Sequence, residues 1–347
     1  MRIALDATYS LGKNLSGVGV YSREMMFGLA RAHPQDHFRF FYRPHRLVKS
    51  FSDPLPPNAS RRLLMAAPRA DLFHALNQRV DRRARRTVST FHDLFVMTGD
   101  YSSPEFRARF TEQARQAADN SDAIIAVSQA TASQVEQLLG VDPSRIHVVP
   151  HGAPQGTSLS SPVGGARREN LVLFVGVIQR RKNLGRLVKA FERLPAGWRL
   201  AVAGASQGYG AAEELRAVEE SPRRGDIDLL GHLPAEHLAA LYARARIFAF
   251  PSLDEGFGMP ILEAMAYGVP VVTSQSSAMP EVAGDAAHLV DPLNIDQLAH
   301  ALTRLAGDEG LRADLIARGR TRVPHFTWDS AVAQTWAVYE KVMVTRS

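Results

Sequence analysis

The sequence contains no cysteine. That absence excludes disulfide bridges, thiolate nucleophiles, and zinc or iron–sulfur centres held by cysteine. Long apolar runs are absent as well, because no stretch reaches the ~18 consecutive apolar residues typical of a spanning helix. Near the start of the chain only Ile3, Ala4 and Leu5 precede Asp6, which is too short an apolar run for a secretory leader. We therefore expect a cytoplasmic protein without a membrane-spanning segment.

What remains is an ordinary globular composition in a chain of 347 residues. Hydrophobic residues make up 45% and charged residues 22%, values that allow a large core and exclude a disordered or collagen-like chain. At about 100–200 residues per domain, this length predicts two domains.

Positive charge is concentrated in the first half of the chain. Residues 1–151 contain 20 basic and 14 acidic residues, whereas the remainder contains 21 of each. The excess is densest between Arg39 and Arg86, with 12 basic and three acidic residues, and arginines crowd the run Arg79–Arg86. Such a region is either a solvated surface or a contact for an anionic partner, for which we favour a membrane surface or an anionic acceptor. Aromatic residues do not alternate with these arginines, so nucleic acid is not an expected partner.

Short apolar segments alternate with amphipathic segments along the whole chain. Strands are expected at residues 2–6, 87–91, 123–127, 146–149, 171–175, 200–203, 227–230, 247–250 and 269–273. Helices are expected at residues 17–31, 106–120, 131–139, 183–193, 235–245 and 260–267, and over most of 295–343. Ser128, close before one of these helices, is a suitable N-cap. Strands that alternate with helices predict parallel sheets covered on both faces.

A change in composition divides this pattern in two. Residues 153–168 are rich in proline, glycine and serine and show no periodicity, which predicts a linker. The predicted fold class is therefore α/β, with two Rossmann-like doubly wound domains at 1–152 and 169–328, followed by a helical segment at 329–347. In such folds ligands bind at the carboxyl ends of the strands, and a cleft between two domains offers a further place.

The segment most informative about function is 254–272, DEGFGMPILEAMAYGVPVV. Gly256 and Gly258 allow the backbone to approach a ligand closely, and Pro260 suits the first turn of a helix. The exposed N–H groups and the positive dipole end of that helix form an anion site. Glu255 stands before this helix and Glu263 lies about one turn inside it. With the anion site between them, the two carboxylates are placed for a sugar and a ribose.

This segment resembles the large retaining glycosyltransferase family of sucrose synthase, bacterial glycogen synthase and many bacterial mannosyltransferases. Glu255 and Glu263 match the paired glutamates of that family. The resemblance implies the type-B glycosyltransferase fold (GT-B), with two Rossmann-like domains facing across a cleft and a terminal helix that crosses back to the first domain. It also implies that Glu255 positions the transferred sugar and that Glu263 binds the ribose. Four neighbouring residues would contact the donor as well: Gly256, Phe257, Gly258 and Met259.

Residues 176–183, GVIQRRKN, resemble the family's loop after the first strand of the second domain. The resemblance implies that Arg181 and Lys182 hold the donor pyrophosphate. Charge argues for the same roles, because a departing nucleoside diphosphate needs cations and charge-assisted hydrogen bonds are strong. Val177 departs from the family pattern, since many relatives have a basic residue there.

Three other segments resemble family positions. Gly17 and Gly19 lie in a glycine-rich turn, which either brings backbone to the donor phosphates or is simply a tight turn before a helix. His92, after the strand at 87–91, either approaches the sugar ring as in the family or is a structural histidine. His232 and Leu233 resemble a loop whose backbone meets the nucleobase.

No metal site is predicted. Asp226 and Asp228 have the spacing of a metal-binding Asp-x-Asp motif, but we interpret one as a turn cap and the other as facing solvent. His147 and His151 lie on a strand and a loop with Pro150 between them, so they do not share a helix face that would suit zinc.

Together these features predict a retaining hexosyltransferase that uses a nucleotide-diphosphate sugar and neither a metal nor another cofactor. Its acceptor would be a sugar, a glycan or a lipid-linked acceptor in bacterial surface polysaccharide or glycolipid assembly. GDP-mannose is the favoured donor, with UDP- and dTDP-sugars open, and the basic first domain fits attachment to the inner face of the membrane. The alternatives are a type-B phosphorylase or epimerase, and a catalytically silent module of the same fold that binds membranes or nucleotide sugars.

Overall fold

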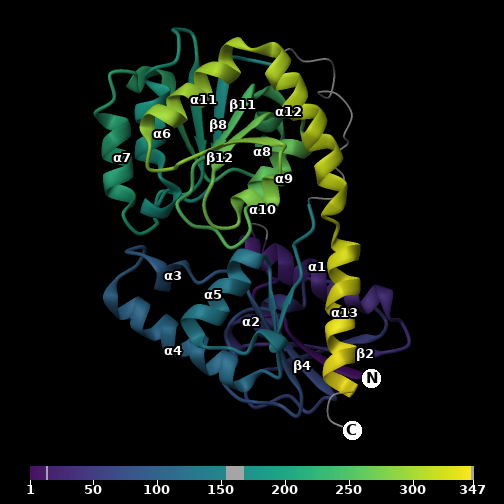
Figure 1. Cartoon of the computed structure of the whole chain (residues 1–347). Helices are drawn as coiled ribbons and strands as arrows, with labels where there is room; N and C mark the ends of the chain where they lie inside the picture. Colours follow the sequence, from purple (N-terminus) through teal and green to yellow (C-terminus); the bar gives the residue numbers. More distant parts are fainter. Residues whose placement is uncertain (13–14, 154–167, 345–347) are drawn as a thin grey trace. The chain divides into compact units, whose positions relative to one another are not determined.

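The computed structural model describes residues 1–12, 15–153 and 168–344. The chain divides into two compact units, each with one parallel sheet and surrounding helices (Figure 1). Unit 1 comprises Met1–Thr98, Pro104–Gly152 and Phe326–Ser347, and unit 2 comprises Gly99–Ser103 and Ala153–His325. The linker predicted at 153–168 lies almost entirely outside the described residues.

The sheet of unit 1 has seven parallel strands. In spatial order they are β3 (Ala59–Leu63), β2 (His37–Tyr42), β1 (Arg2–Asp6), β4 (Leu72–Ala75), β5 (Thr87–Phe91), β6 (Ala123–Ala126) and β7 (Ile146–Val148). β5 and β6 are buried at every position, as expected for inner parallel strands with helices on both faces. The edge strand β3 is only partly buried and carries two arginines, which suits an edge.

The helices of unit 1 follow the chain between and after these strands. They are α1 (Gly17–Ala32), α2 (Pro44–Ser50), α3 (Phe95–Thr98), α4 (Pro104–Asn120), α5 (Gln129–Leu139), the 3-10 turn η1 (Pro143–Arg145) and α13 (Trp328–Val344). The predicted cap of α5 is confirmed, because the Ser128 side chain accepts a hydrogen bond from the N–H of Thr131 at 3.0 Å. The same helix ends at Gly140, whose φ of 66° places it in the left-handed region that glycine tolerates.

Helix α13 comes from the far end of the sequence yet belongs to unit 1. The hydroxyl of its Tyr339 lies 2.6 Å from Nδ1 of His74 on β4, and both side chains are fully buried. At its end, the guanidinium of Arg86 donates to two backbone carbonyls, Val342 at 3.2 Å and Met343 at 3.0 Å. α13 therefore contributes buried packing and polar contacts to unit 1, and its removal would expose that core.

The sheet of unit 2 has six parallel strands. In spatial order they are β10 (Ile227–Gly231), β9 (Arg199–Ala203), β8 (Leu171–Val175), β11 (Ile247–Phe250), β12 (Val271–Ser274) and β13 (Ala287–Val290). The helices are α6 (Leu184–Phe191), α7 (Ala211–Glu219), α8 (Ala235–Arg244), α9 (Met259–Ala266), α10 (Met279–Ala283), α11 (Ile295–Gly307) and α12 (Glu309–Arg322), with 3-10 turns η2 (Arg180–Lys182), η3 (Arg224–Asp226) and η4 (Val323–His325). One apolar cluster between the sheet and helices α6 and α11 forms a large part of its core.

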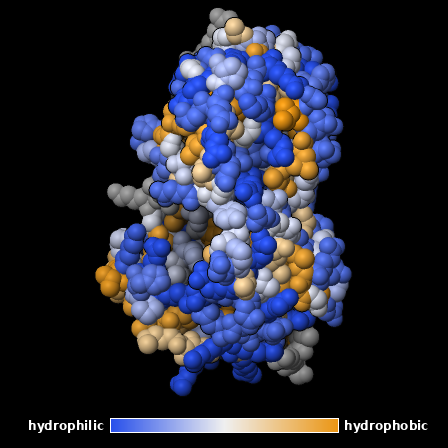
Figure 2. Space-filling view, turned by 90° about the vertical axis from the view of Figure 1, so that its left-hand side faces the viewer, coloured by the Kyte–Doolittle hydropathy of each residue, from blue (hydrophilic) through white to orange (hydrophobic). Residues whose placement is uncertain are grey.

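These elements confirm the predicted α/β class. β5 and β8 have the predicted bounds, α1 ends one residue later than predicted, and α9 begins and ends one residue earlier. The predicted strand at 269–273 instead begins at Val271, because Val269 closes the α9 turn by donating its N–H to the carbonyl of Ala264. Among the described residues no helix is both long enough and apolar enough to cross a bilayer. On the face shown in Figure 2, hydrophilic side chains predominate and apolar ones occur in separate patches.

The two sheets share one strand order, and that order fixes where a ligand would bind. From β1 the chain of unit 1 moves outward to β2 and β3, then returns to β4 on the other side of β1. Unit 2 repeats this order, with β8 in the place of β1 and β11 in the place of β4. At this change of strand order the chain leaves the paired strands toward opposite faces of the sheet. The order therefore predicts a ligand crevice at the carboxyl ends of β1 and β4 in unit 1, and of β8 and β11 in unit 2.

Candidate active site

In unit 2 the loops after β8 and β11 meet at the crevice that the strand order predicts. The loop after β8 begins at Gly176, and Gly204 approaches it so closely that a Cβ on Gly204 would lie 1.8 Å from the Gly176 carbonyl oxygen. Both glycines have φ values near the upper limit of the left-handed region, 153° and 159°. The close approach therefore requires glycine and directs the chain into η2, where Arg181 and Lys182 lie.

Asn183 fastens η2 to the end of β11. Its φ of 61° is unusual for a residue other than glycine, and its amide nitrogen donates to the carbonyls of Pro251 at 3.0 Å and Pro292 at 2.7 Å. The backbone adds a further link, since the N–H of Leu253 donates to the carbonyl of Arg181 at 2.8 Å. These bonds hold the two basic side chains beside the loop after β11.

The three predicted charged residues of unit 2 form one buried cluster, the Arg181–Lys182–Glu255 cluster. A guanidinium nitrogen of Arg181 lies 2.7 Å from one carboxylate oxygen of Glu255, and Nζ of Lys182 lies 2.5 Å from the other. All three residues are at least nine-tenths buried. Lys182 also lies over the ring of Phe250, 4.6 Å from its centroid. The cluster therefore places two cations and one anion at the end of the strands.

The charges in this cluster stabilise one another. Burial alone would raise the pKa of the Glu255 carboxyl, but the adjacent Arg181 and Lys182 outweigh burial and lower that pKa to about 2. Glu255 is therefore ionised at neutral pH. The cluster places two basic side chains next to each other, which suits an anionic ligand.

Ser277 holds the loop that carries Glu255, and the sequence alone did not point to it. The N–H of Glu255 donates to the hydroxyl oxygen of Ser277 at 3.1 Å. That hydroxyl lies 2.7 Å from a carboxylate oxygen of Asp254 and 2.6 Å from the carbonyl of Glu255. Ser277 has a φ of 55°, so this arrangement keeps a non-glycine residue in the left-handed region.

The predicted backbone site lies directly after Glu255. Gly258 has a φ of 102° and is the N-cap residue of α9, so the N-cap position offers no side chain to the first N–H groups of the helix. Phe257 is buried, and Met259 and Pro260 form the first turn of α9. The local geometry thus provides the helix start that the sequence predicts, immediately beside the cluster.

Glu263 lies in α9 and is bound by a tyrosine from another helix. The Tyr242 hydroxyl of α8 donates to a carboxylate oxygen of Glu263 at 2.8 Å, and the Tyr242 and Tyr267 rings stack with centroids 5.3 Å apart. Burial raises the pKa of the Glu263 carboxyl, although the bond from Tyr242 opposes that shift. Tyr242 is a site residue that the sequence analysis missed, because its contact with Glu263 joins two helices that are separate in sequence.

The remaining predicted donor residues of unit 2 lie apart from this cluster. His232 is exposed and Leu233 is half-buried, and both follow β10 at the edge of the sheet. β9 separates β10 from β8, so the described contacts do not join these residues to Arg181, Lys182 or Glu255.

In unit 1, the glycine-rich turn is tightly packed. A Cβ on Gly19 would lie 2.9 Å from the carbonyl oxygen of Tyr9 and 3.1 Å from the side chain of Leu15. The N–H of Gly19 donates to the N-cap side chain of Ser16 at 3.3 Å, and Gly17 begins α1. This geometry accounts for Gly19 as part of a tight turn.

His92 lies in a buried group of rings at the end of β5. Its Nε2 lies 2.9 Å from the carbonyl oxygen of Leu76, so this nitrogen carries the proton and donates. The ring stacks on His151 at 5.4 Å and meets the edge of Tyr21 at 4.8 Å. Burial lowers the pKa of His92 to about 4, so the ring is neutral at physiological pH. Its predicted contact with the sugar stays a prediction.

The two aspartates with Asp-x-Asp spacing each pair with an arginine. Asp226 pairs with Arg223 at 2.9 Å, and Asp228 pairs with Arg199 at 2.6 Å, so the second aspartate has a cationic partner in addition to its solvent contact. Across the described parts of the chain, no three histidine and carboxylate side chains converge on one metal position.

The basic run Arg79–Arg86 offers less free charge than its composition suggests. Arg86 is buried against α13, as described above. Arg79 and Arg83 form ion pairs with carboxylates at 3.0 Å and 2.5 Å. Only part of this run is therefore available to an anionic partner.

Comparison with known proteins agrees with this geometry. The family described as Glycosyltransferase Family 4 matches residues 15–154, and the family described as Glycosyl transferases group 1 matches residues 160–322. The O-antigen chain mannosyltransferase B of Escherichia coli is 30% identical over an alignment that covers 96% of this chain and 98% of the relative. The MMP alpha-(1->4)-mannosyltransferase of Mycolicibacterium hassiacum is 35% identical over 67% of this chain and 57% of the relative.

Solved structures show the same fold at lower sequence identity. Sucrose-phosphate synthase from Thermosynechococcus elongatus has a TM-score of 0.79 and 23% identity, with 99% of this chain and 100% of that chain covered. HepE from Anabaena, in complex with UDP-glucose, has a TM-score of 0.70 and 17% identity, with 98% of both chains covered. The sheet topology, the two family matches and the full-length relative lead to one conclusion: this chain belongs to the group 1 (family 4) glycosyltransferases and has the GT-B fold.

Proposed function

We propose that the protein is a retaining glycosyltransferase that moves a hexose from a nucleotide-diphosphate sugar to an acceptor hydroxyl. The observation that carries this proposal is the Arg181–Lys182–Glu255 cluster, two buried cations on one carboxylate at the crevice of unit 2. A diphosphate carries adjacent negative charges, and an arginine and a lysine side by side bind such a group through charge-assisted hydrogen bonds.

Sugar transfer requires positive groups beside the leaving diphosphate. When the bond between the sugar C1 and the phosphate oxygen breaks, negative charge grows on the departing diphosphate. Arg181 and Lys182 stabilise that charge, and the N–H groups at the start of α9 add donors beside them. The acceptor oxygen bonds to C1 on the same face of the sugar, and its proton passes to the departing phosphate oxygen. No protein side chain is then required as the base.

Glu255 has two roles in this mechanism. Its contacts keep Arg181 and Lys182 in fixed positions before the donor arrives, which reduces the reorganisation needed during the reaction. By the family resemblance, it also positions hydroxyls of the transferred sugar. Its low pKa keeps the carboxylate ionised, so that it acts as a hydrogen-bond acceptor and not as an acid.

Glu263 would bind the ribose of the nucleotide. Its carboxylate is half-buried, and Tyr242 fixes one oxygen by a 2.8 Å bond. A ribose has two adjacent hydroxyls that donate, and a fixed carboxylate accepts from them.

The donor that we favour is GDP-mannose. Two relatives named above are called mannosyltransferases, and one of them covers nearly the whole chain. HepE, a structural neighbour, was solved with UDP-glucose, but its identity to this chain is only 17%, so it does not outweigh the two mannosyltransferases. UDP-sugars and dTDP-sugars are the alternative donors in the test below. The product would be a glycan or glycolipid in bacterial surface polysaccharide assembly.

Peripheral attachment to a membrane is a further part of this proposal. In unit 1, α2 packs on β3, and this edge exposes Val48 by 83%, Phe51 by 67% and Met65 by 73%. Lys49 and Arg62 are exposed on the same two elements and the net charge of the region is positive. Exposed apolar side chains beside cations match an anionic lipid surface. Phe51→Glu should weaken binding to phosphatidylglycerol vesicles, and unchanged binding would contradict this attachment.

One NMR experiment tests the transfer itself. The protein is incubated with GDP-mannose, UDP-glucose or dTDP-rhamnose, with EDTA present. The acceptors are a mixture of methyl glycosides, sugar phosphates and lipid-linked saccharides. We expect one donor to be consumed, and its transferred sugar to keep the anomeric configuration that it had in the donor. Inversion at C1 would contradict the retaining mechanism, and activity that EDTA abolishes and Mg²⁺ restores would contradict metal independence. A protein that binds a donor without consuming it would be a silent module.

A further inference from the structure

A pocket of about 560 Å³ lies in unit 1 at the amino ends of the strands, at the opposite end of the sheet from the predicted crevice. Three of its lining residues stand just before strands: Arg83 before β5, Asp122 before β6 and Arg145 before β7. The last turn of α13 contributes Lys341. A pocket of this volume can hold a small molecule.

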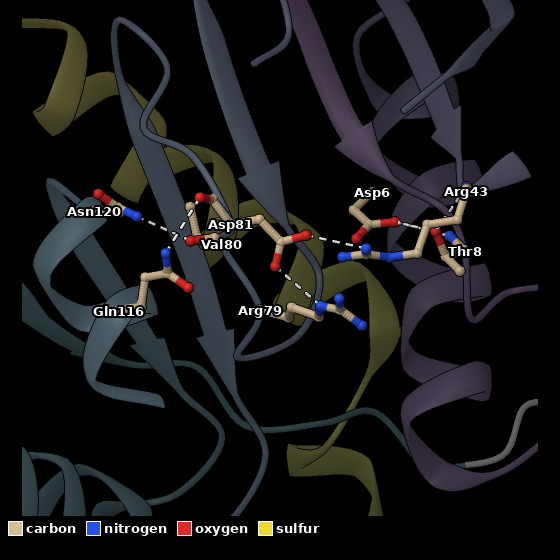
Figure 3. A network of polar contacts seen from close by, with 8 residues as sticks. All are labelled: Asp6, Thr8, Arg43, Arg79, Val80, Asp81, Gln116 and Asn120. Atoms are coloured by element: carbon tan, nitrogen blue, oxygen red, sulfur yellow. Dashed lines mark hydrogen bonds and ion pairs between the residues drawn. The ribbon is translucent and has the colours of Figure 1, made fainter. Parts of the chain in front are cut away.

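The loop before β5 is fastened to the end of α4 (Figure 3). The amide of Asn120, the last residue of α4, donates to the carbonyl of Val80 at 3.0 Å. Further along this loop, Arg83 pairs with Asp122, whose second carboxylate oxygen accepts from the N–H of Thr87 at 2.8 Å. This wall of the pocket is therefore held in place, and its arginine is compensated by a carboxylate.

Arg145 is a second arginine of the pocket, and it is held without a carboxylate. One terminal nitrogen of its guanidinium group donates to the carbonyl of Ala118 at 2.7 Å and to that of Ser121, at the end of α4. No described carboxylate lies within ion-pair distance of this guanidinium group. Arg145 is therefore fixed in position, and the rest of its guanidinium group can bind an anion.

Two further basic side chains, His147 on β7 and Lys341 on α13, line the pocket near each other. Burial lowers the pKa of His147, and the positive charge of Lys341 lowers it further. The ring of His147 is half-buried and has no hydrogen-bond partner in the described part of the chain. Arg145, His147 and Lys341 thus form a basic group that an anion between its members would stabilise.

The chemistry of this basic group and its surroundings narrows the ligand. A guanidinium, an imidazole and an ammonium group together suit a phosphate, which offers three strongly accepting oxygen atoms. Asp119, near the end of α4, is exposed and also lines the pocket. A carboxylate repels a ligand that is anionic throughout, but it accepts hydrogen bonds from hydroxyl groups. The pocket therefore fits a molecule that carries both a phosphate and hydroxyl groups.

The position of the pocket favours a soluble phosphate over a lipid headgroup. The pocket adjoins β6 and β7, whereas the exposed apolar side chains near α2 and β3 lie at the other edge of the sheet. Ala123 and Val342, two apolar residues that line the pocket, are both buried. A lipid would need exposed apolar side chains beside its headgroup site.

We propose that this pocket binds a soluble phosphorylated polyol, such as a sugar phosphate. The phosphate contacts the basic group, and the hydroxyls donate to Asp119. This site goes beyond the proposed function and does not rest on it. Because α4, the loop before β5, β7 and α13 all line the pocket, the bound molecule ties the C-terminal helix to the sheet and stabilises the folded unit 1.

NMR of the histidine rings in the full chain tests this pocket directly. The Cε1–H signal of His147 is identified among the 12 histidines by its loss in His147→Gln. Its chemical shift is followed against pH with mannose 6-phosphate, methyl α-mannoside, inorganic phosphate or phosphatidylglycerol vesicles. The titrations are repeated for Lys341→Gln and for the matched control Lys49→Gln, which changes an exposed lysine of α2 at the other edge of the sheet.

We expect mannose 6-phosphate to raise the midpoint of the His147 titration by about one pH unit, because a bound phosphate favours the protonated ring. Methyl α-mannoside should leave the midpoint unchanged, and inorganic phosphate should bind about tenfold more weakly. Lys341→Gln should weaken mannose 6-phosphate binding about tenfold and raise the His147 midpoint of the free protein. Lys49→Gln should do neither.

The absence of a His147 response to mannose 6-phosphate would overturn the proposal. Equal affinity for inorganic phosphate would also overturn it, as would a response to vesicles alone, which would make the ligand a lipid. A protein that shows the His147 response yet transfers no sugar would refute the proposed function and leave this site standing.

Discussion

The two units have sheets with the same strand order, and both bury ionisable side chains. They differ in whether the buried groups are charged or neutral. Unit 2 buries Arg181, Lys182 and Glu255 as charged groups in direct contact. Unit 1 buries three histidines, His74, His92 and His151, whose pKa values are all lowered by desolvation, to about 3 for His74 and about 4 for His92. These histidines are therefore neutral at pH 7.

The difference follows from the partners available in each unit. A buried base without an adjacent carboxylate loses its proton, whereas adjacent opposite charges keep each other ionised. His74 lies between the hydroxyls of Thr90 and Tyr339, at 2.8 Å and 2.6 Å, which suit a neutral ring. Unit 2 thus keeps its buried side chains charged, and unit 1 keeps its buried rings neutral. Two sheets of the same strand order therefore differ in the charge of their buried side chains.

The largest expected effect is at Glu255. Glu255→Gln removes the charge that holds Arg181 and Lys182, so transfer should fall by at least about 100-fold, as when a group that acts in the transition state is removed. The rate of sugar transfer, with folding checked by circular dichroism, measures this effect. Glu236→Gln changes an exposed carboxylate in the first turn of α8 and should leave the rate unchanged. Near-normal transfer by Glu255→Gln would remove this cluster from the mechanism.

The next effect is on nucleotide affinity. Lys182→Met keeps the apolar part of the side chain but loses the cation, so the Kd for the nucleoside diphosphate should rise by about 10- to 100-fold. Calorimetric titration measures it. Lys189→Met, on the exposed face of α6, is the matched control, and changing His92 in unit 1 should leave this Kd unaltered. An unchanged Kd for Lys182→Met would contradict the diphosphate site.

Acid should lower the stability of the two units to different extents. The folded pKa values of the three histidines lie below the unfolded value of about 6.5, so the unfolded chain takes up protons first. The free energy of unfolding is therefore unaffected by these histidines above about pH 6.5. Below that pH it falls, by up to about 1.4 kcal/mol per pH unit for each histidine. Glu255 contributes fully above about pH 4.5 and loses its contribution only as the pH falls toward 2.

Tryptophan fluorescence can follow this difference. The chain has three tryptophans, of which Trp328 and Trp336 lie in unit 1 and Trp198 lies in unit 2. Denaturant unfolding of Trp198→Phe therefore reports on unit 1, and the double change Trp328→Phe with Trp336→Phe reports on unit 2. Between pH 7 and 5 the free energy of unfolding should fall more for unit 1. Equal decreases would show that the buried histidines do not dominate its acid response.

The smallest effect concerns the ribose. Tyr242→Phe removes the hydroxyl that binds Glu263, which should reduce nucleoside diphosphate affinity about threefold to tenfold and stability by about 1 kcal/mol. Affinity for inorganic pyrophosphate should not change, because it lacks a ribose. Tyr267→Phe keeps the stacked pair and serves as control. Equal losses for both ligands would place Glu263 away from the ribose.

The sequence was sufficient for the parts that depend on local pattern. β5 and β8 were predicted from apolar runs, and the cap of α5 from Ser128. Four strands were missed: β2, β3, β4 and β13. A buried histidine interrupts the apolar pattern of β4, and exposed arginines hide β3. Asn183, Ser277 and Tyr242 were not recognised as site-forming residues, since their contacts come from segments distant in sequence and appear only after packing.

Thermal unfolding in the presence of GDP, UDP, ADP, dTDP or NAD tests the diphosphate site most directly. A ligand at 100 times its Kd stabilises the folded protein by about 2.7 kcal/mol, which raises the Tm measurably. We predict that one nucleoside diphosphate raises the Tm of the unmodified protein and that Lys182→Met loses most of this rise. A rise with NAD alone, or the same rise in both proteins, would contradict the assignment of the Arg181–Lys182–Glu255 cluster as the donor diphosphate site.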